Sequence, residues 1–131
     1  MLDLRTRQVT TLPGSEGFFS PRWSPDGRYI AAIPVKVFSL MLYDLQMQKW
    51  SEIAKGVGNP HWSRDGKYIY FSGVYRLRIA DLKREQLASV EGIRLAIGTF
   101  GSSQGQTEDE EPLVLRDVGI QEIYALEWKT P

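Results

Sequence analysis

A ten-residue segment occurs twice in this chain, and this repeat constrains the fold more than any other feature of the sequence. Residues 21–30 read PRWSPDGRYI and residues 60–69 read PHWSRDGKYI, so seven of the ten positions are identical at an offset of 39 residues. Each copy is followed by an apolar run that ends in Asp-Leu, at 40–45 and at 77–82. Because sequence periods of about 20–50 residues are typical of solenoids and propellers, tandem units of about this length are expected.

Each unit has the residue pattern of short β-strands joined by tight turns. In both copies an Asp-Gly pair, at 26–27 and at 65–66, stands between two apolar runs. Such a pair is a strong hairpin signal, because glycine adopts positive φ at little steric cost. Few windows space apolar residues three and four apart, and glycine or proline interrupts most of those. The sequence therefore predicts an all-β chain with four strands in each unit.

Four antiparallel strands in a tandem unit of this size are typical of a β-propeller blade. The segment WSPDG, the aromatic and aliphatic run after it and the later Asp-Leu together resemble the propeller repeat of the TolB family, most closely over residues 18–93. The two tryptophans are expected to pack between adjacent blades, and the Asp-Gly pairs to form hairpin turns. The structural residues that recur are Trp23, Asp26, Gly27 and Asp44 in the first copy and Trp62, Asp65, Gly66 and Asp81 in the second.

A third copy of the repeat is present in a degenerate form. Asp109 takes the place of the turn aspartate, but the tryptophan is missing, and polar residues stand at 103, 104 and 106 where the other copies are apolar. The blade made by this copy is expected to be the least stable. The predicted organisation is an outer strand within 1–17, blades at 18–57 and 58–93, and a degenerate blade at 94–131 that lacks its outer strand.

The two ends of the chain are expected to divide a blade between them. Residues 2–4, Leu-Asp-Leu, resemble the end of a third strand, so residues 8–12 are expected to form a fourth, outermost strand. Strands are expected at 94–100, 112–116 and 121–128. Three blades do not close a ring, since propellers have about four to eight. Two chains could exchange outer strands to form a six-bladed homodimer, or the chain is a fragment or engineered unit of a longer propeller without independent function.

Composition and charge exclude several classes of protein. Sixteen Lys and Arg residues balance sixteen Asp and Glu residues, so the chain lacks the broad positive field of a nucleic-acid binder. There is no Cys and one His, which excludes disulfides, thiolate metal sites and multi-His metal sites, and no cofactor is expected. No apolar run reaches the about 18 residues of a membrane span, and no signal-peptide core follows Met1. The cellular compartment is left open.

Four side chains are candidates for binding. Strand alternation turns Arg22 and His61 away from the tryptophans and toward the central channel or its rim, where they could contact an anionic ligand or an acidic peptide. Arg76 and Arg78 share one strand face within a local basic cluster. The alternatives are a hydrogen-bonded spectator role for His61, and a salt-bridged blade face or pairing with the acidic run 108–111 for the two arginines.

The residues needed for catalysis do not form a recognisable set. There is no Gly-x-Ser-x-Gly motif, the single His stands within a repeat, and the acids fall on turns, Asp-Leu positions or the loop run. The sequence therefore favours a non-enzymatic module that binds a protein, a peptide or a small polar ligand. The alternative is a substrate-gating or binding propeller domain of an enzyme such as an oligopeptidase or a carbohydrate lyase.

Overall fold

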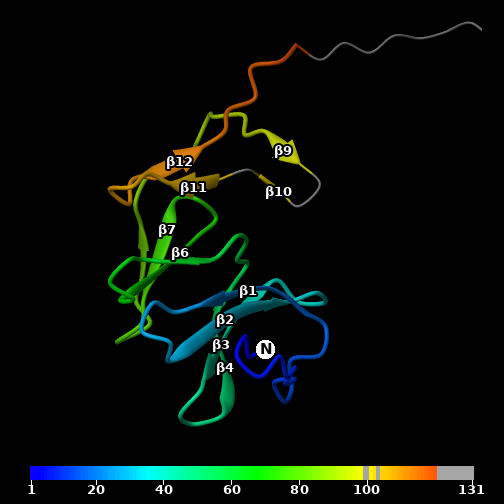
Figure 1. Cartoon of the computed structure of the whole chain (residues 1–131). Coiled ribbons are helices and arrows are strands. Elements are labelled where there is room, and N and C mark those ends of the chain that lie inside the picture. Colours follow the sequence, from blue (N-terminus) through cyan, green and yellow to red (C-terminus); the bar gives the residue numbers. More distant parts are fainter. Residues whose placement is uncertain (99–100, 103, 121–131) are drawn as a thin grey trace, which may run out of the picture.

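The regular elements of this protein are all β-strands in the part that the structure describes. The structure is a computed structural model, and it describes residues 1–98, 101–102 and 104–120. The units follow one another in a row, with the N-terminus at one end and β9–β12 at the other (Figure 1). The first sheet contains β1 (Phe18–Trp23), β2 (Tyr29–Pro34), β3 (Ser39–Asp44) and β4 (Lys49–Lys55), and the second contains β5 (His61–Trp62), β6 (Tyr68–Phe71), β7 (Tyr75–Arg78) and β8 (Arg84–Gln86).

Both four-stranded sheets are antiparallel meanders in which each strand pairs with the next one in sequence. This is the strand arrangement of a propeller blade. The registers of the two copies agree, since Trp23 is opposite Ile30 and Trp62 is opposite Ile69. The all-β fold class predicted from the repeat is confirmed. Within the described ranges, no helix is present that could cross a membrane.

The repeated turn is built from the same hydrogen bonds in both sheets. The buried hydroxyl of Ser24 donates to Asp26 Oδ1 (2.6 Å) and accepts from the N–H of Tyr29 (2.8 Å). In the second sheet, Ser63 donates to Asp65 Oδ1 (2.7 Å) and accepts from the N–H of Tyr68 (3.0 Å). The backbone N–H of Lys67 and the Ser63 hydroxyl lower the pKa of Asp65 to about 2. The turn glycines have φ of 73° and 70°, a region that favours glycine.

The apolar core lies between the first and the second sheet. Side chains from β2 and β3 meet side chains from β6 and β7, and Val57 in the connection joins them. All of these residues are almost fully buried, and Trp62 packs against them from the innermost strand. Neighbouring units thus complete each other's core. The buried cluster consists of Ala31, Leu40, Leu42, Val57, Ile69, Phe71 and Leu77.

Residues 1–12, here called the N-terminal arm, form an exposed hairpin. Leu2 and Val9 form an antiparallel bridge, the N–H of Asp3 donates to the carbonyl of Gln8 (2.9 Å), and the N–H of Thr10 donates to the carbonyl of Met1 (2.8 Å). The outer strand expected at 8–12 is reduced to one bridged residue, Val9. A single neighbouring segment, residues 1–3, provides its hydrogen bonds among the described residues, which is too little to extend a regular ladder.

The region after the second sheet contains two small hairpins. β9 (Ile97–Gly98) pairs with β10 (Gly101–Ser102), and β11 (Gln104–Gln106) pairs with β12 (Pro112–Val114). Leu95 and Arg116 form a bridge between the segments that flank these hairpins. Strands β9 and β12 thus lie within the ranges expected at 94–100 and 112–116. Residues 99–100 of the first range and the strand expected at 121–128 lie outside the described residues.

Candidate functional site

Trp62 shows how one unit docks on the unit before it. Its indole Nε1 donates to the backbone carbonyl of Arg22 in β1 (3.0 Å), and its ring stacks on Tyr29 of β2 with centroids 6.3 Å apart. The innermost strand of the preceding sheet thus provides the hydrogen-bond partner of this partly buried indole N–H. One aromatic side chain of the second sheet thus makes both an apolar contact and a hydrogen bond with the first sheet.

Trp23 occupies the same position in the first sheet, but no sheet formed by the described residues packs against it. Its side chain is 51% exposed, and it borders a cavity of about 470 Å³. The surface around it is called the Trp23 face. It comprises Phe18, Pro21, Trp23, Ile30, Ala32 and Trp50.

The N-terminal arm forms the opposite wall of this cavity through Met1, Val9 and residues 10–12. The chain between the arm and β1 is fixed to the outer strand, because Trp50 Nε1 donates to the carbonyl of Pro13 (2.9 Å). Phe18 and Tyr43 both contact the ring of Trp50, with centroids 4.7 and 5.0 Å from it. The Trp23 face is therefore an ordered apolar surface with the arm held beside it.

His61 lies on the other side of the second sheet, facing the β11–β12 hairpin. Its Nδ1 is 3.1 Å from the carbonyl of Asn59, so this nitrogen carries the proton, and its ring stacks on Tyr70 at 5.9 Å. Burial lowers the pKa of His61, and the nearby charge of Arg22 lowers it further. The imidazole is therefore neutral near pH 7. Its Nε2 is buried and has no partner among the described residues.

A cavity of about 320 Å³ separates His61 from the β11–β12 hairpin. Glu110 spans this space, since its carboxylate accepts from the backbone N–H of Arg64 (2.8 Å) and from the hydroxyl of Tyr70 (2.9 Å). Burial raises the pKa of Tyr70, and the bond to Glu110 raises it further. The two amide atoms of Gln106 are buried here without partners in the part of the chain described. The contact between the second sheet and the β11–β12 hairpin is therefore polar, whereas the contact between the first and second sheets is apolar.

Arg76 and Arg78 form ion pairs on the face of the second sheet. Arg76 Nε is 2.7 Å from Glu85 Oε2, and the guanidinium of Arg78 bridges Glu85 (2.9 Å) and Asp81 (3.1 Å). The guanidinium of Arg76 also lies over the ring of Tyr68, 4.4 Å from its centroid. The arrangement has the form of the salt-bridged blade face that was the alternative interpretation. The acidic run contributes Glu110, which contacts Arg64 and Tyr70 instead.

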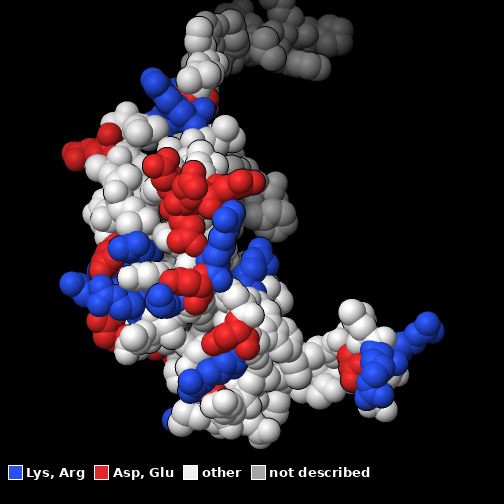
Figure 2. Space-filling model, turned by 60° about the vertical axis from the view of Figure 1, so that its left-hand side comes forward, with Lys and Arg blue, Asp and Glu red and all other residues white. Residues whose placement is uncertain are grey.

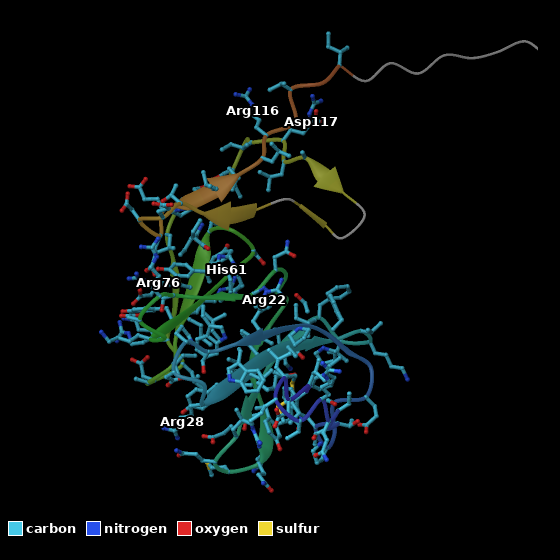
Figure 3. The ribbon with its side chains drawn as sticks, viewed as in Figure 1. Arg22, Arg28, His61, Arg76, Arg116 and Asp117 are labelled. Atoms are coloured by element: carbon cyan, nitrogen blue, oxygen red, sulfur yellow. The ribbon has the colours of Figure 1, made fainter. Side chains whose placement is uncertain are left out.

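Arg22 and the Asp-Leu aspartates have different surroundings. Arg22 is exposed and donates to the carbonyl of its neighbour Pro21 (3.1 Å), and Figure 3 shows it between the two sheets, close to His61. It borders a groove of about 420 Å³ with Phe19, Ile33 and Phe38. Asp44 accepts two backbone N–H groups of its turn and pairs with Arg28 at 3.1 Å, while Asp81 accepts the N–H of Lys83.

The sequence did not predict the hydrogen bond between Tyr70 and Glu110. It also did not predict the cavity next to this bond or the cavity next to Trp23. Glu110 is 40 residues away from Tyr70, and no spacing rule connects a turn residue of one unit to a strand residue of another. Acidic and basic side chains are mixed over the surface in Figure 2. No group of three His, Cys, Asp or Glu side chains able to hold a metal occurs among the described residues.

Comparison with known proteins supports the fold. A structure of TolB from Acinetobacter baumannii is 26% identical, with a TM-score of 0.51 over 71% of this chain and 25% of that chain. The blades are TolB-like propeller blades. A TolB structure from Agrobacterium tumefaciens is 25% identical, with a TM-score of 0.44 over 62% of this chain and 32% of that one. The chain thus spans about a quarter to a third of these structures. No family model and no curated protein matches the chain.

Proposed function

We propose that this chain is a non-enzymatic protein-interaction module of TolB-like propeller type, which associates with a second copy of itself to complete a ring. The observation that carries the proposal is the contrast between two equivalent tryptophans. Trp62 is covered by the preceding sheet, whereas Trp23, on the same scaffold, is open to solvent. An exposed apolar face whose equivalent in the second sheet packs against another sheet supports a role in protein binding.

The energetic gain from covering this face is substantial for one side chain. A tryptophan buries roughly 150–250 Å², and at about 25 cal/mol per Å² covering the exposed half of Trp23 would contribute about 2–3 kcal/mol. Half-buried Phe18 borders the same cavity, whereas Ile30 and Ala32 at its floor are already buried, so the gain comes mainly from Trp23. Part of this gain is offset by the loss of translational and rotational freedom on association.

Arg22 is the predicted binding residue that best fits a ligand role in the assembled protein. Its guanidinium is exposed and borders the apolar groove with Phe19 and Phe38. An acidic peptide with an apolar side chain matches this combination of charge and shape. Arg76 and Arg78, by contrast, already bind carboxylates of their own sheet.

The mass in solution tests the proposed assembly. The chain would be measured by light scattering behind size exclusion over a hundredfold dilution, with circular dichroism to verify the β-fold at each concentration. The expected mass at high concentration is twice 14.9 kDa, falling toward one chain on dilution. A folded monomer at every concentration contradicts the proposal.

A further inference from the structure

The N-terminal arm has the geometry of the outer hairpin of a blade. In the first sheet, Asp44 Oδ1 accepts the N–H groups two and three residues ahead (2.8 and 3.0 Å), and Tyr43 is opposite Trp50. In the arm, Asp3 Oδ1 accepts the N–H groups two and three residues ahead at the same distances, and Leu2 is opposite Val9. The arm therefore corresponds to the end of a third strand and the start of a fourth.

The arm lies beside a cavity on its inner side. The arm forms one wall of the cavity of about 470 Å³, and the Trp23 face forms the other. In a four-stranded blade the first and second strands lie inward of the third and fourth. Two inner strands of such a blade would lie in the space between the arm and the Trp23 face, which exposed Val9 borders.

The β11–β12 hairpin has the geometry of such a pair of inner strands. Two backbone hydrogen bonds of its turn have counterparts in the β5–β6 turn. The N–H of Thr107 donates to the carbonyl of Glu111 (3.0 Å), and the N–H of Ser63 donates to the carbonyl of Tyr68 (2.9 Å). The N–H of Glu110 donates to the carbonyl of Thr107 (3.0 Å), and the N–H of Gly66 donates to the carbonyl of Ser63 (3.0 Å). This correspondence places Gln106 where Trp62 stands. Leu113 is opposite Gly105, as Tyr70 is opposite His61, so Leu113 is equivalent to Tyr70.

The same correspondence identifies the free face of this hairpin. Tyr70 and His61 are on the face of the second sheet that meets the following unit. Leu113 is at the equivalent position on β11–β12, and Leu115 follows it by two residues on the same face. The two leucines are 50% and 55% exposed. Within residues 1–98, 101–102 and 104–120, apolar side chains are therefore exposed at both ends of the row of units.

We propose that the β11–β12 hairpin of a second copy occupies the space between the N-terminal arm and the Trp23 face, with its Leu113 and Leu115 against that face. This inference rests on the proposed self-association and specifies its surfaces. The indole N–H of Trp62 donates to the carbonyl of Arg22, the residue before Trp23. Gly105 is the residue before Gln106, so the indole N–H of Trp23 would donate to the carbonyl of Gly105 of the second copy. The contact is head-to-tail, and such contacts form rings when the rotation closes. Two chains of three units give six blades, within the known range of about four to eight.

Cross-linking between two cysteine variants tests this docking mode. The chain contains no native cysteine, so only the introduced cysteines can react. A Pro21→Cys chain and a Leu113→Cys chain would be mixed, allowed to re-equilibrate and treated with a short bifunctional thiol reagent. Pro21 lies on the Trp23 face, so a cross-linked heterodimer is expected. The matched control pairs Leu113→Cys with Met47→Cys, whose exposed side chain lies at the β3–β4 turn, and little product is expected.

A charge substitution provides a second, independent measurement. Leu113→Glu would place a carboxylate in the apolar contact, and the concentration at half-dissociation is expected to rise at least tenfold. Leu82→Glu changes a comparably exposed leucine at the β7–β8 turn and is expected to leave it unchanged. Circular dichroism verifies that both variants fold.

The outcomes separate this inference from the proposed function. A dimer by mass that gives no Pro21–Leu113 product, or equal product with the Met47 control, overturns the docking mode and leaves self-association intact. A chain that stays monomeric overturns both. A dimer with the selective product and the shift for Leu113→Glu supports both.

Discussion

The two contacts between consecutive units differ in chemistry although both place an inner strand of one unit against the unit before it. The first and second sheets meet through a continuous apolar core that Trp62 closes. The second sheet and the β11–β12 hairpin meet through the bond between Tyr70 and Glu110 and a cavity that holds Gln106. One position of the repeat, Trp in one unit and Gln in the next, accompanies the change from an apolar to a polar contact. The repeat thus fixes the docking geometry and leaves the strength of docking to a few side chains.

The largest expected effect concerns the apolar contact. Trp62→Ala removes the ring stacked on Tyr29 and the bond to Arg22, and it is expected to lower the free energy of unfolding by about 3 kcal/mol. Urea denaturation at a concentration where the chain is monomeric measures this. Trp23→Ala is the matched control. In the monomeric chain it is expected to lower the free energy of unfolding by less than about 1 kcal/mol, because that ring is half exposed. Equal losses would contradict the distinction between a covered and an open face.

The repeated turn is expected to respond equally in the two sheets. Ser24→Ala and Ser63→Ala each remove a buried hydroxyl that donates to an aspartate and accepts a backbone N–H. Each is expected to cost about 1–2 kcal/mol, since a backbone donor loses its partner. Denaturation of both variants side by side is the measurement. A difference above about 1 kcal/mol would show that the two turns are not energetically equivalent.

A smaller effect of opposite sign is expected at the polar contact. Both amide atoms of Gln106 are buried without a partner in the described residues. Gln106→Leu replaces them with apolar atoms and is expected to stabilise the β11–β12 hairpin by about 1 kcal/mol. Amide hydrogen exchange in β11 and β12 should slow accordingly. Gln86→Leu is the control at an exposed position, and a similar slowing in that variant would reject the explanation.

The smallest effect is a pH dependence carried by His61. Burial holds its pKa below its usual value, whereas the unfolded chain has a His pKa near 6.5. Between these two values the unfolded state binds more protons, so stability falls as pH drops through about 6.5 and levels off below the folded pKa. His61→Gln is expected to flatten this part of the pH profile, as measured by denaturation between pH 8 and 5. An unchanged profile would show that His61 titrates normally.

The sequence predicted the elements that have local causes. The Asp-Gly turns and the strands around them lie close to the expected places. The turns depend on hydrogen bonds between residues at most five apart, and these turns bring the neighbouring strands into register. The outer strand expected at 8–12 is only a bridge in the structure. A strand needs a neighbour, and a neighbour that belongs to another unit does not appear in local sequence patterns.

Candidate site residues were harder to place than strands. Arg76 and Arg78 both pair with Glu85 on the next strand, so these ion pairs depend on strand register, which alternation along one strand does not predict. His61 was expected at the channel or its rim, and the structure places it against Tyr70, facing the next unit. Side chains of an inner strand point to the two faces of their own sheet, and in a propeller these faces meet neighbouring blades.

The sequence by itself determined the repeat, the all-β class and the TolB-like blade, because these follow from periodicity and turn chemistry within each unit of about 40 residues. The tertiary structure alone decided that Trp62 is covered and Trp23 open, that Glu110 reaches Tyr70, and that the N-terminal arm stands beside an apolar face. Identical residues acquire different surroundings because burial depends on whether a neighbouring unit is present, which is a property of the assembled units and not of the repeat.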